Sequence, residues 1–135
     1  MSIPFLACMV ATAAFYHLPP RVLPSIQAVE GGQVGSVHVN ANGTADLGVM
    51  QVNTMWIRPL AQSARLEPQV VIGRLIYDPC FNIAASGAIM KTYIAQAHGN
   101  LALAIGYYHS HTPALRLHYE FQVLAAAGAL FLHRK

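Results

Sequence analysis

The sequence has few charged residues and no long apolar run. Only 10% of its 135 residues are Asp, Glu, Lys or Arg, while 55% are hydrophobic. A chain of this composition is neither intrinsically disordered nor a salt-bridged coiled coil. Its most apolar stretches, residues 3–15 and 123–132, are shorter than the about 20 apolar residues that cross a bilayer, so we expect no membrane span. The length suits one domain with its own hydrophobic core, which we expect to cover residues 1–135.

Positive charge is present but is not clustered. The formal net charge is +3, and Lys and Arg residues are scattered singly along the chain. Proteins that bind nucleic acid gather such residues in a patch or stripe, so we expect no nucleic-acid partner. A diffuse positive charge instead favours weak attraction to an anionic polymer, and the bacterial cell wall is one such polymer.

The N-terminal segment lacks the positive charge of a signal peptide. Its first 20 residues contain no Lys or Arg, although residues 3–15 are largely apolar. Pro4, His17 and Pro19-Pro20 also make it unsuitable as a membrane span. We therefore expect a buried first helix, in a mature chain from which the export signal is absent.

Cysteine is nearly absent. Cys8 and Cys80 are the two cysteines of the sequence, and no CxxC pair indicates zinc binding or thiol redox chemistry. Two buried free thiols and a single disulfide are both consistent with this pattern. A disulfide over this span stabilises a protein by roughly 4 kcal/mol and indicates an oxidising compartment outside the cytoplasm.

Proline, glycine and helical periodicity divide the chain into helices with one irregular segment between them. Residues 33–46 mix single valines with Gly, Asn and Ser, and Asn42-Gly43 is a strong signal for a tight turn, so we expect a small irregular hairpin. Asp78-Pro79 and Thr112-Pro113 each join an N-cap residue to proline at the first helical position. The expected helices cover residues 4–16, 20–30, a short stretch capped by Asn53 or Thr54, 67–75, 79–98, 101–108 and a last helix from 113 onward. The sequence therefore predicts a mostly helical domain with one small β segment.

Glu30 stands out among the five acidic residues. The other four acidic residues have ordinary structural explanations. Asp78 suits a helix cap and Asp46 a turn, while Glu67 and Glu120 suit solvated positions. Glu30 instead ends an apolar helix and precedes Gly31-Gly32, which terminate that helix. The helix dipole disfavours a negative charge at this end, and desolvation there raises the pKa of a carboxyl group, as a general acid requires.

Four segments carry motifs in a fixed order along the chain. Residues 28–32 (AVEGG) are similar to an "ESG" region in which Gly31 stands at the serine, and residues 40–53 (NANGTADLGVMQVN) are similar to "N-x-N-G-S-x-D-x-G-L-M-Q-I-N". Residues 78–83 (DPCFNI) are similar to "D-P-C-x-N-I", and residues 104–109 (AIGYYH) to "A-x-x-x-Y-N" with histidine in place of asparagine. Together these segments resemble the soluble lytic transglycosylase family, in particular the small enzymes of conjugation and secretion machines.

The resemblance implies a mostly α, lysozyme-like α+β fold with the hairpin beside an active-site cleft. It also implies cleavage of the β-1,4 bond between N-acetylmuramic acid and N-acetylglucosamine, with formation of a 1,6-anhydro ring. Glu30 would serve first as the acid and then as the base, without a cofactor. A hydrolase of lysozyme type would need a second carboxylate, for which Asp46 is the contender in this sequence.

The resemblance further implies which residues contact the glycan. Gly48 would let the backbone approach the sugar, while Met50 and Gln51 would line the floor of the cleft. Tyr108 would bond to the Glu30 carboxyl or to the sugar. His109, in the place of the family's asparagine, adds a group that titrates near neutral pH. Substrate binding is therefore expected at Gly48, Met50, Gln51, Tyr108 and His109.

Two histidines and one tryptophan have competing explanations. His109 and His111 are two residues apart, but no acid or cysteine close in sequence completes a metal site, so we expect no metal. Trp56 is suited equally to stacking on a sugar and to the core.

The small enzymes of this family carry a cysteine in their first helix, so the resemblance also implies a Cys8–Cys80 disulfide. It implies an exported, periplasmic protein that acts on peptidoglycan strands beside an envelope-spanning machine. The departures at Gly31 and His109 keep open a second possibility, a catalytically weak peptidoglycan-binding assembly factor.

Overall fold

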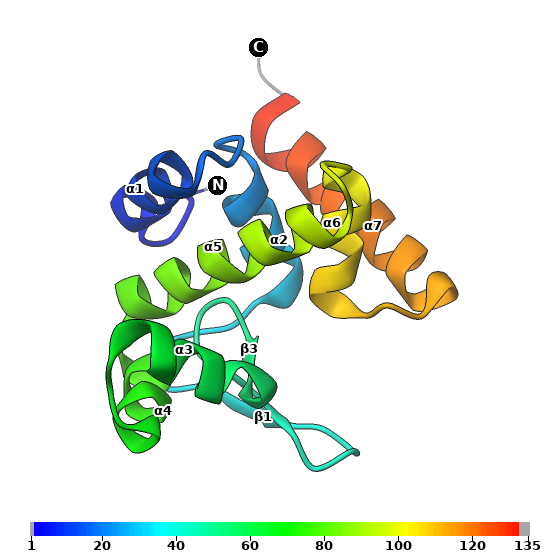
Figure 1. Cartoon of the computed structure of the whole chain (residues 1–135). Coiled ribbons are helices and arrows are strands. Elements are labelled where there is room, and N and C mark those ends of the chain that lie inside the picture. Colours follow the sequence, from blue (N-terminus) through cyan, green and yellow to red (C-terminus); the bar gives the residue numbers. More distant parts are fainter. Residues whose placement is uncertain (1, 133–135) are drawn as a thin grey trace.

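A computed structural model describes residues 2–132 of the chain (Figure 1). Helix α5 crosses the middle of the molecule, with α1 and α2 on one side, α3, α4 and the strands on another, and α6 and α7 at its C-terminal end (Figure 1). The α-helices are α1 (Leu6–Tyr16), α2 (Val22–Glu30), α3 (Ile57–Ala64), α4 (Pro68–Tyr77), α5 (Pro79–Gln96), α6 (Leu101–His109) and α7 (Pro113–Ala127). A 3₁₀ turn, η1 (Thr54–Trp56), precedes α3, and a π-helical segment, η2 (Gly128–Leu132), follows α7.

Helix α5 forms the centre of the core. The Asp78 side chain caps its start by accepting a hydrogen bond from the Phe81 amide at 3.0 Å, and Pro79 fills the first position. α5 packs against α1, α2, α4 and α6, so it buries residues on several faces, such as Ile83 and Met90. Within residues 2–132, no helix is both long enough and apolar enough to pass through a membrane.

The small sheet has three antiparallel strands in the order β1-β2-β3. They are β1 (Val37–Val39), β2 (Ala45–Leu47) and β3 (Val52–Asn53). Gly43, at φ 89°, completes the turn between β1 and β2, and Asp46 of β2 lies opposite Asn53 of β3. β1 is exposed along its length, whereas β2 and β3 are anchored in the core by Leu47 and Val52. β2 and β3 therefore hold the small sheet against the core, while β1 lies at the surface.

The predicted fold class, a mostly helical α+β domain with a small β segment, is confirmed, and the structure adds β3 to the predicted hairpin. Several local details differ, among them the starts of the first two helices and the end of α5, since α2 begins at Val22 and α5 ends at Gln96. The first helix begins at Leu6 because Phe5 adopts a left-handed conformation at φ 54°. The fourth helix extends to Tyr77 instead of ending at residue 75. The Thr112 side chain accepts no capping hydrogen bond, and the Thr112 amide donates to Ser110 Oγ at 3.0 Å.

A disulfide joins α1 to the first turn of α5. Its partners are Cys8 and Cys80, whose Cα atoms are 5.4 Å apart and which are separated by 72 positions in the sequence. α1 also packs along α5, and Met9 and Ala13 of α1 are buried. The crosslink therefore secures the N-terminal helix to the central helix of the fold.

Candidate active site

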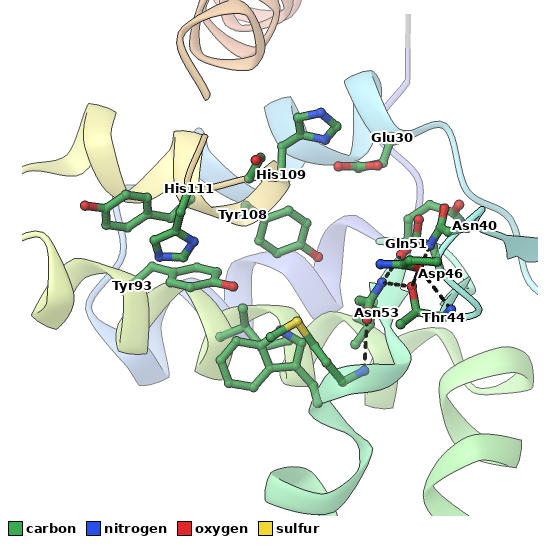
Figure 2. A pocket seen from close by; sticks show the side chains of 17 residues that line it. Glu30, Asn40, Thr44, Asp46, Gln51, Asn53, Tyr93, Tyr108, His109 and His111 are labelled. Atoms are coloured by element: carbon green, nitrogen blue, oxygen red, sulfur yellow. Dashed lines mark hydrogen bonds between the residues drawn. The ribbon is translucent and has the colours of Figure 1, made fainter. Parts of the chain in front are cut away.

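A cleft of about 370 Å³ opens where α2 ends, between the sheet and α6. One side, which we call the polar wall, consists of Asn40, Asn42, Thr44, Asp46, Gln51 and Asn53. The other, the aromatic wall, consists of Trp56, Tyr93, Tyr107, Tyr108, His109 and His111. Figure 2 shows Glu30 together with Gln51, Asp46 and Asn53 toward one side of Tyr108, while His111 and Tyr93 lie toward the other.

Glu30 is the last residue of α2 and lies at the edge of this cleft. The helix ends there because Gly31 adopts a left-handed conformation at φ 67°, and its amide donates to the Gln27 carbonyl at 2.8 Å. Burial raises the pKa of Glu30 from its usual 4.5 to about 7; the hydrogen bond from Tyr119 opposes this rise, and the negative charge of Asp46 adds to it. The carboxyl group therefore exchanges its proton near neutral pH.

Gly32 fixes the distance between Glu30 and the polar wall. A Cβ atom at position 32 would collide with the Gly48 carbonyl oxygen and would lie 2.7 Å from the Val49 oxygen. The chain after α2 thus packs backbone against backbone on residues 48–49. No side chain fits in this contact, which explains a glycine at position 32.

Tyr119 of α7 holds the Glu30 carboxyl group. Its hydroxyl donates to Glu30 Oε2 at 2.7 Å, and its side chain is buried. Burial first, and then the charge of Glu30 and this hydrogen bond, raise the pKa of Tyr119 far above its usual range, so the hydroxyl remains a donor. The sequence placed residue 119 on the last expected helix and gave it no role in the site. The available signal was that a buried tyrosine needs a partner for its hydroxyl.

Tyr108 lies at the cleft but does not bond to Glu30. Its half-buried side chain donates instead to the Met50 carbonyl oxygen at 2.8 Å. This corrects the first of its two predicted roles, because the tyrosine that reaches the carboxylate is Tyr119. Burial raises the pKa of Tyr108 well above its usual value, and the charge of Glu30 adds to the effect. Tyr108 therefore joins α6 to the turn before β3 across the floor of the cleft.

Gln51 lies in the cleft in a fixed orientation. Its backbone is left-handed, at φ 53°, which is uncommon outside glycine. Its side-chain Nε2 donates to Ser36 Oγ at 3.2 Å and to the Gly48 carbonyl at 3.0 Å. The nitrogen end of this amide is thus held by bonds within the protein, and Gln51 lines the cleft.

The structure does not bring Gly48 or the Met50 side chain to the cleft surface. Met50 is 0% exposed and lies in the core, so it corrects the prediction that this side chain forms the cleft floor. Gly48, at φ 69°, lies against the Leu75 carbonyl and the Asn82 side chain, where an added Cβ would collide with both. The glycine is thus explained by packing inside the protein instead of close approach to a sugar.

Asn82 holds this turn from within the core. Its Nδ2 donates to the carbonyl oxygens of Leu47 and Leu75, both at 2.8 Å, and its Oδ1 accepts from the Met50 amide at 2.8 Å. Asn82 itself is 0% exposed. One amide of α5 therefore satisfies three backbone groups and ties α4 and the cleft turn together.

Hydrogen bonds along the polar wall hold Asp46 in place. Asn53 Nδ2 donates to Asp46 Oδ1 at 2.9 Å and to Thr44 Oγ1 at 3.2 Å. Asn40 also donates to Thr44 Oγ1, at 3.1 Å. Among the cleft-lining residues within 2–132, Glu30 and Asp46 are the two carboxylates. The wall therefore offers amides and hydroxyls beside one further acid.

The aromatic wall consists of stacked and edge-to-face rings. The exposed His109 ring stacks on Tyr119 with centroids 5.0 Å apart, and His111 stacks on Tyr107 at 4.0 Å. Trp56 meets Tyr93 edge to face at 5.6 Å, so it is both a packing residue and a lining residue. The two histidines thus stack on different tyrosines, and residues 2–132 contain no group of three or more metal-ligating side chains.

A half-buried carboxyl group with a raised pKa thus lies beside a cleft lined by amides, hydroxyls and aromatic rings. The domain family described as Transglycosylase SLT domain matches residues 7–116. The chain therefore belongs to the transglycosylase SLT family. The match ends before Tyr119, so the residue that holds Glu30 lies outside the segment that it covers.

Two curated relatives are similar to the chain over most of its length. Protein IpgF of Shigella flexneri is 28% identical over 98 residues, which cover 72% of this chain and 60% of the relative. Invasion protein IagB of Salmonella typhimurium (strain SL1344) is 24% identical over 110 residues, which cover 81% of this chain and 65% of the relative. The chain thus spans less than two thirds of the length of either relative.

Proposed function

We propose that the protein is a peptidoglycan lytic transglycosylase in which Glu30 is the single general acid and base. The observation that carries this proposal is the half-buried Glu30 carboxyl, whose pKa is raised to about 7, at the edge of a cleft lined by hydrogen-bonding side chains. A group with this pKa is present in both protonation states near neutral pH, as a residue that gives and then takes a proton must be. Membership of the transglycosylase SLT family supports the same reaction.

The reaction proceeds in two proton transfers. Protonated Glu30 donates to the oxygen that links N-acetylmuramic acid to N-acetylglucosamine, and the bond from the anomeric carbon to this oxygen breaks. The C6 hydroxyl oxygen of the muramic residue then bonds to the anomeric carbon, and its proton passes to the Glu30 carboxylate. The acid is regenerated, no water is consumed, and the product carries a 1,6-anhydro ring.

The remaining cleft residues bind and orient the glycan. Gln51 and the polar wall offer hydrogen bonds to the acetamido and hydroxyl groups of the sugars, and Tyr108 and His109 form the facing side. Such contacts hold the C6 hydroxyl near the anomeric carbon, and this intramolecular geometry supplies much of the rate of ring closure.

Asp46 favours a second candidate function, hydrolysis of lysozyme type. It lines the same cleft as Glu30, and its charge raises the pKa of Glu30. In that reaction Asp46 would activate water or bond to the sugar while Glu30 protonates the leaving group. The bond from Asn53 and the place of Asp46 in the sheet instead support a structural and glycan-binding role.

Digestion of purified peptidoglycan with wild type and Glu30→Gln tests these alternatives. Mass spectrometry of the products separates anhydro ends from reducing ends, because the two differ by one water. The lytic transglycosylase proposal expects anhydro ends from wild type and a loss of about 100-fold or more in Glu30→Gln. Reducing ends would identify a hydrolase. Equal inertness of both proteins, with glycan binding retained, would identify a binding factor.

We further propose that the protein acts in the periplasm, where it opens the wall locally for a secretion or conjugation apparatus. The disulfide between Cys8 and Cys80 supports an oxidising compartment. The resemblance to small enzymes of such machines supports the setting, as does the similarity to IagB, an invasion protein. Fractionation of cells that express the native gene, with an assay of the disulfide, tests the compartment.

A further inference from the structure

A second cavity, of about 400 Å³, lies between the start of α2 and the helices α6 and α7. These helices pack together at the C-terminal end of α5 (Figure 1). Among residues 2–132, none lines both this cavity and the cleft at Glu30. We call it the apolar groove and define it by its main apolar side chains: Val22, Leu101, Ile105, Leu117, Phe121 and Leu124.

α7 forms an exposed apolar rim along this groove. Leu117, Phe121 and Leu124 are 46%, 70% and 69% exposed. Their spacing of four and three residues places them on one face of the helix, while Tyr119 and Val123 are buried. Large apolar side chains left open on successive turns, beside a concave surface, indicate a binding site.

The polar residues of the groove leave one cation to meet an occupant. The Ser25 hydroxyl donates to the Arg21 carbonyl at 2.7 Å, and Glu120 accepts from Arg116 at 2.9 Å. Arg21 also lines the groove, and within residues 2–132 it forms no ion pair. Its Cζ atom lies 5.4 Å from the centroid of the Phe131 ring. The guanidinium group is thus placed beside η2.

The cation and the apolar rim lie at different points along the groove. Leu117 is near the start of α7, whereas Phe131 is in η2 at its far end. At a helical rise of about 1.5 Å per residue, these two positions are roughly 20 Å apart along the axis. The groove therefore complements an elongated apolar body that carries negative charge at one end.

The size of the groove favours a small ligand over a protein partner. A stable protein interface buries about 800 Å² on each partner, and the exposed lining of the groove is a small fraction of that area. Its volume instead lies within the range of about 300–1,000 Å³ that is usual for sites that bind small molecules.

We propose that the apolar groove binds a single-chain anionic amphiphile, such as a free fatty acid. The acyl chain lies along Leu117, Phe121 and Leu124, and the carboxylate meets Arg21. This binding site is separate from the transglycosylase reaction and does not depend on the role of Glu30.

Isothermal titration of the whole protein with dodecanoate, below its micelle concentration, tests the site. We expect a Kd of about 100 μM or tighter. Decanoate and then octanoate should each bind about 10-fold more weakly, because two methylene groups leave the groove at each step. Dodecyltrimethylammonium has the same chain with a positive head group, so it should bind at least about 5-fold more weakly than dodecanoate.

Substitutions at exposed positions locate the binding. Leu124→Gln removes part of the rim, and Ala102→Trp fills the groove, so each should weaken dodecanoate binding about 10-fold or more. Arg21→Gln should weaken it about 5-fold and abolish the preference for dodecanoate over dodecyltrimethylammonium. The matched control is Phe15→Gln, because Phe15 is 74% exposed on α1 and does not line the groove. It should bind as wild type does, and melting temperatures verify that every variant is folded.

A Kd weaker than about 1 mM, no dependence on chain length, or equal weakening by Phe15→Gln and Leu124→Gln would overturn the proposal. Equal affinity of wild type for the two head groups would also overturn it. Sedimentation with phosphatidylglycerol vesicles, in the absence of binding to monomeric dodecanoate, would overturn it in favour of a membrane-surface contact. Glu30→Gln should bind dodecanoate as wild type does, so a failure of the proposed enzymatic function is distinguishable from a failure of this proposal.

Discussion

The sharpest stability prediction concerns Asn82→Ala. The Asn82 side chain serves two carbonyl oxygens and one amide, each at 2.8 Å, in a site with no exposure to solvent. Truncation to alanine leaves all three backbone groups buried without a partner, and each such group costs about 1–3 kcal/mol. Because the small cavity permits some relaxation, we expect a total loss of about 3–6 kcal/mol from the free energy of unfolding.

That loss is comparable to the whole stability of a typical domain, which is about 5–15 kcal/mol. Asn100→Ala is the matched control, because the Asn100 side chain also accepts a hydrogen bond from a backbone amide. That amide belongs to Leu103, at 3.1 Å, and Asn100 lies at an exposed helix cap. It should cost about 1 kcal/mol. Urea unfolding of the oxidised proteins, followed by circular dichroism, gives both values. An Asn82→Ala cost no larger than that of the control would show that the buried amide does not hold the cleft turn.

Three further predictions use the same unfolding assay. Gly48→Ala should lower the free energy of unfolding by about 3 kcal/mol or more, because the new Cβ atom has no room. Gly43→Ala is the control: Gly43 also has a positive φ but has no atom within 4 Å of the added Cβ, so it should lose about 1 kcal/mol. Equal losses in the two variants would refute the packing argument. Replacing Cys8 and Cys80 together by serine should lower stability by about 4 kcal/mol, and a reductant should lower wild type by a similar amount; a reductant effect on the double variant would contradict this. Glu30→Gln should have the same free energy of unfolding as wild type below pH 4.5 and should be more stable than wild type by up to about 3 kcal/mol above pH 7. The reason is that the pKa of Glu30 is higher in the folded protein than in the unfolded chain, so wild type loses stability as the pH rises through this range. A constant difference between the two proteins from pH 4 to pH 8 would exclude this.

The parts of the fold that could be predicted are those set by local chemistry. Asp78-Pro79 starts α5 because a cap and a proline satisfy the first turn without help from the rest of the chain. Asn42-Gly43 gives a turn because glycine tolerates a positive φ, and Gly31 ends α2 for the same reason. The position of Glu30 at a helix end therefore follows from neighbours in the sequence.

The parts that could not be predicted depend on partners far away in the chain. The bond from Tyr119 to Glu30 exists because α7 packs on α2, and the three bonds of Asn82 exist because α5 passes beneath the cleft turn. The motif around Met50 placed it close to the cleft but gave no indication of which way its side chain points. Its burial and the exposure of His109 were settled by tertiary packing alone.

The contact at Gly32 makes the protein's geometry independent of most of its cleft side chains. Because main chain meets main chain between residue 32 and residues 48–49, the backbone itself sets the spacing from Glu30 to the polar wall. Exposed cleft-lining positions such as Asn42 can then vary without displacing Glu30. Relatives, or libraries made in the laboratory, can thus explore new glycan preferences at that edge while the proton-transfer apparatus keeps its dimensions.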